Sequence, residues 1–428
     1  MNYQAMSPIQ LKAEHEQIKN IYSVFKEKNL TFDMSRGKPE PRQLSFSLEM
    51  LNNLKSDADC KGKDGIDVRN YGAPTGITEI KELFSQVLDV KTSEIAIGGN
   101  SSLKLMYNVL VDAMLIGLPE SRRPWSKEEK IKFLCPAPGY DRHFSMCEHL
   151  GIEMITVPML QTGPDMDQIE QLVSEDESIK GVWCVPKYSN PTGITFSDET
   201  VRRFATLKPK ATDFRIFWDN AYMIHDLYES TDPLLNIIEE AKNAGNPNLV
   251  FEFFSTSKIT FAGGGICVVA SSANNIRWLN DCMALEGLGY DKVNQLRHAR
   301  YIKNPENLHR IMMQHASILR PKFEAVTDTF ETCFGDCGIA TWHKPNGGYF
   351  ISLDVFDGTA KRTWQLASEL GITLTPVGAT FPYRKDPNDR NLRIAPSNVP
   401  IEQVSVISEM ICVCARLAAL EKLIGIDS

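Results

Sequence analysis

Four short polar segments directly follow apolar stretches, and they contain side chains that can do chemistry. They are Pro138-Gly139-Tyr140, Ser189-Asn190-Pro191-Thr192-Gly193, Asp219-Asn220-Ala221-Tyr222 and Ser255-Thr256-Ser257-Lys258. Each alone has an ordinary structural explanation, because Asn-Pro-Thr-Gly is typical of turns and an aspartate often caps a helix. In an open α/β sheet, however, ligands bind beyond the carboxyl ends of the strands. Together, in this order, the segments predict one shared pocket.

Lys258 is the candidate nucleophile or proton carrier of this pocket. It follows an apolar strand, where partial loss of hydration favours the uncharged amine and frees its lone pair. The alternative, a solvated surface charge, is disfavoured by Ser255 and Ser257 in the same loop, since hydroxyl groups there can bind an anion. Asn100, Ser101 and Ser102 precede a helical pattern over residues 103–114, and a helix N-terminus attracts phosphate.

The elements that must position these residues form a regular alternation between residues 131 and 270. Apolar runs typical of buried strands occur at Ile131–Cys135, Met154–Val157, Gly181–Val185, Arg215–Trp218, Leu249–Phe254 and Ile266–Ala270. Helical spacing occurs at Met166–Val173, Glu199–Leu207, Leu234–Ala244 and Ala273–Ala284. This alternation predicts an α/β fold with a mainly parallel sheet covered on both faces.

The last hundred residues predict a smaller α+β unit. Tyr349–Leu353 and Ile372–Thr375 are candidate strands, and Pro400 opens an amphipathic helix. The proline-rich segment Ser35–Leu44 is expected to be an extended arm. We therefore predict three parts: residues 1–50 as an arm and part of the small domain, 51–317 as the large domain, and 318–428 as the small domain.

Composition narrows the function further. The chain has 428 residues, 46 Lys and Arg against 54 Asp and Glu, and a net charge of −8, which disfavours a nucleic-acid partner. The sequence shows no run of eighteen apolar residues and no signal-peptide core, so we expect no membrane partner and a cytoplasmic location. The ten cysteines lack zinc-site spacing, which predicts reduced thiols and no metal.

The ordered set of motifs resembles the fold type I pyridoxal-phosphate enzymes of the class I/II aminotransferase family, from about Arg36 to Pro396. The motifs are Tyr71 with Gly76, Asn100-Ser101-Ser102, Pro138-Gly139-Tyr140, Asn190-Pro191-Thr192-Gly193, Asp219 with Tyr222, Ser255-x-x-Lys258, Gly347-Gly348-Tyr349-Phe350 and Arg393. Within the family, the segments from Ser35 to Pro39 and from Pro138 to Phe144 are similar to a bacterial aspartate aminotransferase branch, often grouped with the aminotransferase domains of MocR-type regulators. The resemblance implies a seven-stranded, mainly parallel sheet in the large domain.

The resemblance also implies a role for each motif around pyridoxal 5'-phosphate. Lys258 would carry the cofactor as a Schiff base and move the substrate's Cα proton, and Asp219 would keep the pyridine nitrogen protonated. Tyr222 and Asn190 would donate to the phenolic oxygen. Tyr140 would stack on the ring, and His143 would hold Asp219 ionised from behind.

The phosphate and the substrate are assigned to further residues in the same way. Asn100, Ser101, Ser102, Ser255 and Ser257 would bind the phosphate, joined by Tyr71 of a neighbouring subunit, which implies a homodimer with shared active sites. Many members of the family carry an arginine eight residues after the lysine, whereas this chain has Ile266. Nearby glycine amides or a cation from elsewhere must then meet the phosphate charge.

Arg393 would bind the substrate α-carboxylate, with Gly37 and Asn190 beside it. An acidic substrate needs a second cation for its side-chain carboxylate. Arg142 is the leading candidate because it lies two residues from Tyr140. Lys38, Lys292 and Arg297 are the alternatives.

The predicted reaction is ping-pong transamination between L-aspartate and 2-oxoglutarate, so the partners are a small amino acid and a 2-oxo acid. One alternative is aromatic or kynurenine transamination, or C–S β-elimination, on the same scaffold, since fold alone does not fix chemistry. Another is a ligand-sensing regulator, which the few residues before Ser35 disfavour because they leave no room for a DNA-binding domain. A catalytically dead homologue is disfavoured by the presence of both Lys258 and Asp219.

Overall fold

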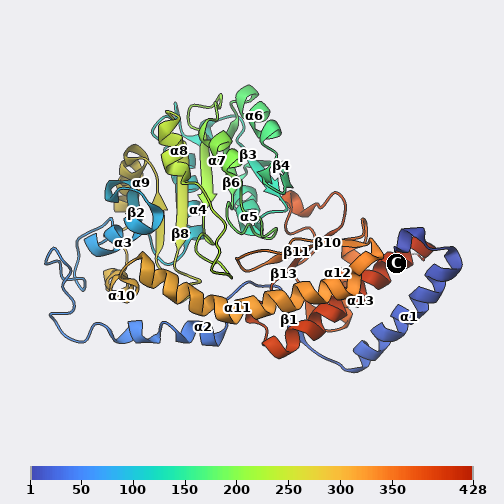
Figure 1. Cartoon of the computed structure of the whole chain (residues 1–428). Coiled ribbons are helices and arrows are strands. Elements are labelled where there is room, and N and C mark those ends of the chain that lie inside the picture. The colour runs from blue at the N-terminus through green and yellow to red at the C-terminus, as the bar shows by residue number, and fades with distance from the viewer. Residues whose placement is uncertain (1, 427–428) are drawn as a thin grey trace.

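The computed structural model describes residues 2–426 and contains a large central sheet between two layers of helices (Figure 1). The order of its strands is β2-β9-β8-β7-β6-β3-β4-β5. Their bounds are β2 (Ile95–Ile97), β3 (Lys132–Ala137), β4 (Glu153–Leu160), β5 (Gly163–Pro164), β6 (Ile179–Cys184), β7 (Arg215–Asp219), β8 (Val250–Ser255) and β9 (Cys267–Ala270). Each of the six apolar runs found in the sequence overlaps one of these strands.

The sheet is mainly parallel, as predicted. Strands β4, β3, β6, β7 and β8 run in the same direction, whereas β9 is antiparallel to both β8 and β2. The large sheet has eight strands rather than seven, because the two-residue β5 folds back on the end of β4. Five parallel strands therefore end on one edge, where the polar segments follow them.

Helices cover both faces of the sheet because successive strand residues point to opposite sides. On β7, Phe217 packs with α4 (Ser102–Leu115), α5 (Asp141–Leu150) and α9 (Ala273–Glu286). Its neighbours Ile216 and Trp218 pack on the other face. The helices of that face are α6 (Met166–Glu175), α7 (Asp198–Ala205) and α8 (Ile237–Asn243). The remaining large-domain helices are α3 (Thr78–Leu88) and α10 (Lys292–Ile302).

The small domain combines a three-stranded antiparallel sheet with long helices. Its strands are β10 (Ala340–Trp342), β11 (Ile351–Val355) and β13 (Asn391–Ile394), and a second pair joins β1 (Phe32–Asp33) to β12 (Ile372–Thr373). Its helices are α1 (Pro8–Glu27), α12 (Ala360–Glu369) and α13 (Ile401–Ile424). The N-terminal α1 packs along α13 and belongs to this core.

Helix α11 (Pro305–Phe334) connects the two domains along the base of the molecule (Figure 1). Ile311 and Met312 pack in the large-domain cluster, and Leu319 and Phe323 pack in the small-domain cluster. The proposed boundary between residues 317 and 318 falls between these two groups, inside one continuous helix.

Two segments differ from the expectation of the sequence. The arm is extended only to Glu40, because Pro41 opens the short helix α2 (Pro41–Ser45) and the Glu40 N–H donates to Gln43 Oε1 at 3.1 Å. Helix α13 is long and apolar enough to cross a membrane by length and composition, but 72% of its most apolar window is buried in the protein. It is therefore a core helix of the small domain.

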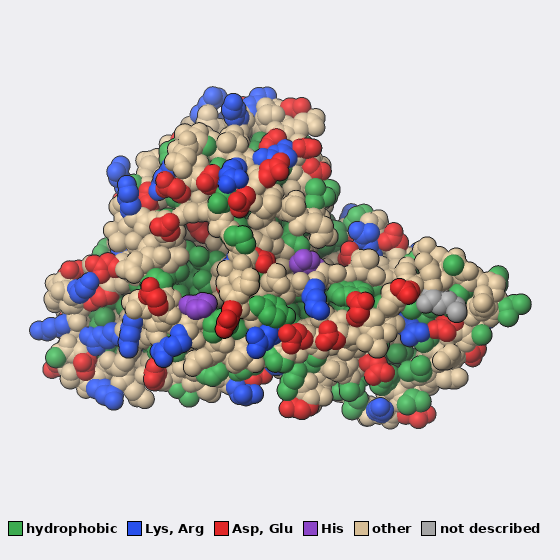
Figure 2. All heavy atoms as spheres, in the orientation of Figure 1, with side chains coloured by type: hydrophobic (Ala, Val, Ile, Leu, Met, Phe, Trp, Pro, Cys, Tyr) green, Lys and Arg blue, Asp and Glu red, His purple; other side chains and the backbone are tan. Residues whose placement is uncertain are grey.

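The surface carries mixed charge. Figure 2 shows Lys and Arg side chains interspersed with Asp and Glu over the viewed face.

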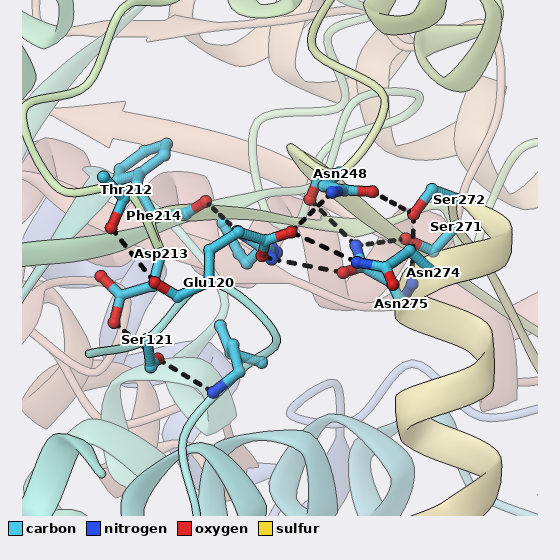
Figure 3. Close-up of polar contacts among 12 residues, drawn as sticks. Glu120, Ser121, Thr212, Asp213, Phe214, Asn248, Ser271, Ser272, Asn274 and Asn275 are labelled. Carbon is cyan, nitrogen blue, oxygen red and sulfur yellow. Dashed lines mark hydrogen bonds and ion pairs between the residues drawn. The ribbon is translucent and has the colours of Figure 1, made fainter. Parts of the chain in front are cut away.

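A polar network ties the start of β7 to neighbouring loops at the edge opposite the polar segments (Figure 3). The Arg215 side chain is 2% exposed and pairs with Glu120, whose side chain is 29% exposed. The Glu120 carboxylate also accepts from Asn248 at 2.6 Å and from Asn274 at 3.3 Å. Burial lowers the pKa of the Arg215 guanidinium, and Glu120 opposes this shift. The carboxylate thus stabilises a buried cation.

We expect Glu120→Gln to destabilise the protein by about 3 kcal/mol, because it removes the carboxylate that pairs directly with the buried Arg215 charge. Arg215→Met should cost less, since the remaining Glu120 carboxylate is in contact with water. Urea unfolding midpoints of the two variants and of the double variant measure this order. The opposite order, with Arg215→Met the more harmful, would contradict the assignment of Glu120 as the required counter-charge.

Candidate active site

Lys258 lies in the loop that follows β8, and its amine faces two aromatic rings. Lys258 Nζ is 5.0 Å from the centroid of the Tyr222 ring and 5.8 Å from that of Tyr349. The loop is fixed on both sides of the lysine. The Ile266 N–H donates to Thr256 Oγ1 at 2.9 Å, and Thr260 Oγ1 is 2.9 Å from His298 Nε2. The amine is therefore held at the carboxyl edge of the sheet.

Asp219, the last residue of β7, is a buried carboxylate with one oxygen held and one unpaired. His143 Nε2 lies 3.0 Å from Asp219 Oδ2, and the His143 ring stacks on Trp183 at 4.2 Å with an interplanar angle of 7°. Asp219 Oδ1 is buried and has no hydrogen-bond partner in the described chain. A buried carboxylate oxygen without a partner is costly. A ligand that brings a cationic N–H fits this position.

Two tyrosines border the same space. Tyr140 stands edge-on to His143 with ring centroids 5.0 Å apart. Burial raises the pKa of Tyr140 to about 12, although the Lys258 charge opposes the shift. Burial also raises the pKa of Tyr222, and the nearby Asp219 charge adds to it. Both phenols therefore remain protonated at neutral pH and can donate hydrogen bonds.

The residues predicted to bind an anion come together at the start of α4. Ser257 Oγ donates to the Asn100 carbonyl at 3.0 Å, and Ser255 Oγ donates to Ser257 Oγ at 3.2 Å. Ser101 is the N-cap of α4, which begins at Ser102. Hydroxyl groups and the free N–H groups of a helix N-terminus suit a phosphate. Ile266, in place of the family's arginine, is 2% exposed and packs in an apolar cluster.

Arg393 lies on β13 and reaches the pocket from the small domain. Its Nη1 donates to Asn190 Oδ1 at 3.3 Å and to Asp141 Oδ1 at 2.9 Å. Its Nε and Nη2 donate to Thr375 Oγ1 at 3.3 and 3.1 Å. The guanidinium also lies 4.9 Å from the centroid of the Phe350 ring. It is a buried, oriented cation of the kind that binds a carboxylate.

Gly37 lies against Phe350, the ring that contacts Arg393. A Cβ atom at position 37 would lie 2.5 Å from Phe350 Cζ, so a larger residue there would displace the ring. Sequence reasoning missed Asp141 and Thr375 as partners of Arg393. Asp141 could have been considered as a partner, because it lies inside the motif that runs from Pro138 to Phe144. Thr375 lies outside every motif, and nothing in the sequence indicates its contact with Arg393.

Other predicted residues are not brought into the pocket within one chain. Tyr71 is 78% exposed. Arg142 and Lys38 are exposed, and their side chains make no hydrogen bond or ion pair within residues 2–426. Lys292 is buried on α10, and Arg297 on the same helix is half-buried with its Nε unpartnered among the described residues.

The carboxyl edge of this mainly parallel sheet carries a lysine, a buried aspartate, phenol donors and a group of residues suited to an anion. This combination defines a pyridoxal-phosphate enzyme of fold type I. The family model for aspartate amino-transferase matches residues 6–427, and the chain belongs to that family. It is a pyridoxal-phosphate-dependent aminotransferase.

Similar proteins agree with this assignment. A putative aminotransferase of Mycolicibacterium smegmatis is 44% identical over 426 residues, which cover 99% of this chain and 100% of that protein. An aspartate aminotransferase of Corynebacterium glutamicum is 44% identical over 95% of this chain and 94% of its own. The crystal structure of an aspartate transaminase from C. glutamicum superposes with a TM-score of 0.96 at 43% identity, covering 99% of both chains.

The environment of Asp219 gives a testable expectation for cofactor binding. We expect His143→Phe to weaken the affinity of the apoenzyme for pyridoxal phosphate by about tenfold or more, the effect of losing one charged hydrogen bond. Without His143, the buried Asp219 loses the hydrogen bond that orients its carboxylate, and it holds a cationic ring nitrogen less well. Absorbance titration of the apoenzyme with pyridoxal phosphate measures the affinity. His149→Phe, on the exposed side of α5, is the control, and equal affinities for both variants would refute the role of His143.

Proposed function

We propose that this enzyme transfers the amino group of L-aspartate to 2-oxoglutarate by a ping-pong mechanism. The observation that carries the proposal is the buried Arg393 guanidinium, in contact with Asn190 in the same pocket as Lys258 and Asp219. An arginine there can fix an α-carboxylate and so orient the Cα–H bond. The name of the Corynebacterium relative, aspartate aminotransferase, supports the choice of substrate.

Each residue has a distinct task in this proposal. Pyridoxal phosphate, when bound, supplies the electron sink for the reaction. Asp219 would pair with the protonated ring nitrogen, and His143 would support the Asp219 carboxylate from behind. Tyr222 and Asn190 would donate hydrogen bonds to the phenolic oxygen. Lys258 Nζ would take the proton from the substrate Cα and carry it during the amino transfer.

The remaining cofactor contacts belong to the same proposal. Tyr140 would cover the ring face. The phosphate would be held by neutral donors, namely the side chains and amides of Asn100, Ser101, Ser102, Ser255 and Ser257.

The side-chain carboxylate of aspartate requires a second cation, and we keep Arg142 as the leading candidate. Its exposure on α5 and lack of contacts leave it free to bind an anion. Lys38, Lys292 and Arg297 are the alternatives.

We also propose a cytoplasmic homodimer in which each chain completes the other's site. Tyr71 is 78% exposed. Two apolar side chains, Leu285 and Leu288, are also exposed, at 89% and 66% respectively. Tyr71 and Leu288 line the same surface hollow. Exposed apolar side chains grouped in this way favour coverage by a second copy.

Supplying aspartate and 2-oxoglutarate and following oxaloacetate tests the reaction directly. We expect the wild type to form oxaloacetate and glutamate, and Lys258→Ala to form neither, because the proton carrier is lost. Arg142→Ala should lose aspartate and glutamate activity while it retains cofactor absorbance. Turnover of aromatic amino acids, kynurenine or a cysteine conjugate in the absence of aspartate activity would instead favour the alternative chemistries.

The shared site is tested by mixing two inactive variants. Lys258→Ala and Tyr71→Ala chains, unfolded together and refolded, should regain about a quarter of wild-type activity, because half of the dimers are mixed and carry one intact site. Each variant refolded alone provides the baseline. If Tyr71 serves its own chain, the mixture will show no gain over these baselines.

A further inference from the structure

The arginine assigned to the substrate carboxylate already holds a carboxylate of the protein. Asp141 Oδ1 lies 2.9 Å from Arg393 Nη1. The other acceptors of this guanidinium, Asn190 and Thr375, are neutral. Asp141 is therefore the one charged partner of Arg393 in the described chain. The Arg393 side chain is 8% exposed, and that of Asp141 is 29% exposed.

This ion pair connects the two domains. Asp141 is the first residue of α5, which follows β3 in the large domain, whereas Arg393 lies on β13 in the small domain. Because successive helix residues are rotated by about 100°, the first turn of α5 points three ways. Asp141 meets Arg393 and His143 meets Asp219, while the Arg142 side chain between them is exposed.

We propose that Asp141 is an internal substitute for the substrate α-carboxylate, and that substrate binds Arg393 by displacing it. The proposal rests on the function of Arg393 given above. A buried guanidinium without an anion is strongly unfavourable. Exchange of one carboxylate for another keeps Arg393 paired both before and after substrate binds.

The Asp141 side chain can leave Arg393 without becoming buried elsewhere. It is partly exposed and can turn to water while it stays at the N-terminus of α5, where the helix dipole favours an anion. Only molecules in which Asp141 has left Arg393 can bind the substrate carboxylate. The apparent substrate affinity is therefore lower than the intrinsic affinity, in proportion to the fraction of such molecules. A ligand without a carboxylate gains no affinity from Arg393. It would displace Asp141 and supply no anion in its place.

The alternative role for Asp141 is a fixed support that orients Arg393. The two roles predict opposite effects of removing the charge. If Asp141 competes with the substrate, its neutralisation strengthens carboxylate binding; if it supports Arg393, neutralisation weakens it.

The test uses Asp141→Asn in the cofactor-loaded enzyme, a change that keeps the shape and removes the charge. Binding of succinate and of acetate, neither of which has an amino group to transfer, is measured by calorimetry, together with KM and kcat for the amino donor. We expect both carboxylates to bind about tenfold more tightly, the effect of removing one charged competitor. KM should fall in parallel with little change in kcat, since the interaction affects binding rather than the chemical step.

The same helix provides a matched control. Glu148 on α5 pairs with Arg384 of the small domain at 3.1 Å, so Glu148→Gln also removes an ion pair between the domains but leaves Arg393 untouched. We expect its carboxylate affinities to equal those of the wild type. An equal gain in both variants would mean that looser domains, not competition at Arg393, explain the effect, and would overturn the proposal. Unchanged or weaker binding in Asp141→Asn would overturn it as well.

The two probes separate this proposal from the assignment of the substrate. Tighter acetate binding by Asp141→Asn, with no aspartate turnover in the wild type, would uphold the competition at Arg393 while refuting aspartate as the donor. Aspartate turnover by the wild type, with unchanged acetate and succinate binding in Asp141→Asn, would uphold aspartate as the donor and refute the competition at Arg393.

Discussion

A carboxylate buried at the end of β7 is the constraint around which the active site is arranged. Asp219 loses most of its contact with water, and a buried charge is stable only when it is paired and hydrogen-bonded. His143 supplies one partner and Trp183 fixes the imidazole ring by stacking. The second oxygen has no partner within residues 2–426. The protein thus retains an unfavourable position that a cationic N–H group of a ligand would make favourable.

The scaffold holds this arrangement because its central strands are buried on both faces. Side chains of β6, β7 and β8 are buried throughout, and alternate residues pack against the two helical layers. Close packing of this kind resists small displacements. Loops that leave the ends of such strands start from fixed positions, so Asp219 and Lys258 both come close to Tyr222 although they lie 39 positions apart in the sequence. The small domain completes the pocket with Arg393, and α11 joins both cores.

Much of the large domain could be predicted from the sequence, because its strands are continuous apolar runs between clear turns. The apolar run of β2 is only three residues long and was not recognised; this strand pairs with β9 at the edge of the sheet. Helix α1 was not recognised because its apolar side chains are widely spaced among charged ones, yet Leu11, Ile18 and Phe25 bury one stripe against α13. The local hydrophobic pattern therefore located the strands that are continuous apolar runs. It did not locate elements whose burial depends on partners distant in the sequence.

The same distinction applies to the site. Lys258, Asp219 and Asn190 stand in recognisable motifs, and the structure brings all three to one edge of the sheet. Thr375 contacts Arg393 from a separate segment, and the contact of Asp141 with Arg393 spans 252 residues of chain. No periodicity or spacing encodes such a contact. Tyr71 is 78% exposed in one chain, so the proposed role of Tyr71 requires a second surface that a single sequence does not display.

The replacement of the family's arginine by Ile266 fits the way charge is distributed over the pocket. Ile266 is buried among apolar side chains and its amide donates to Thr256, so the residue supports the Lys258 loop by packing. An arginine there would have to leave these neighbours to reach an anion. Within the described chain, the charged side chains of the pocket lie at its other ends, with Asp219 hydrogen-bonded to His143 and Arg393 paired with Asp141. The residues proposed to bind the phosphate offer hydroxyl groups and the N-terminus of α4 instead. Neutral donors fixed by a helix need no counter-charge when the site is empty, whereas Arg393 does, which gives a physical reason for a carboxylate at position 141.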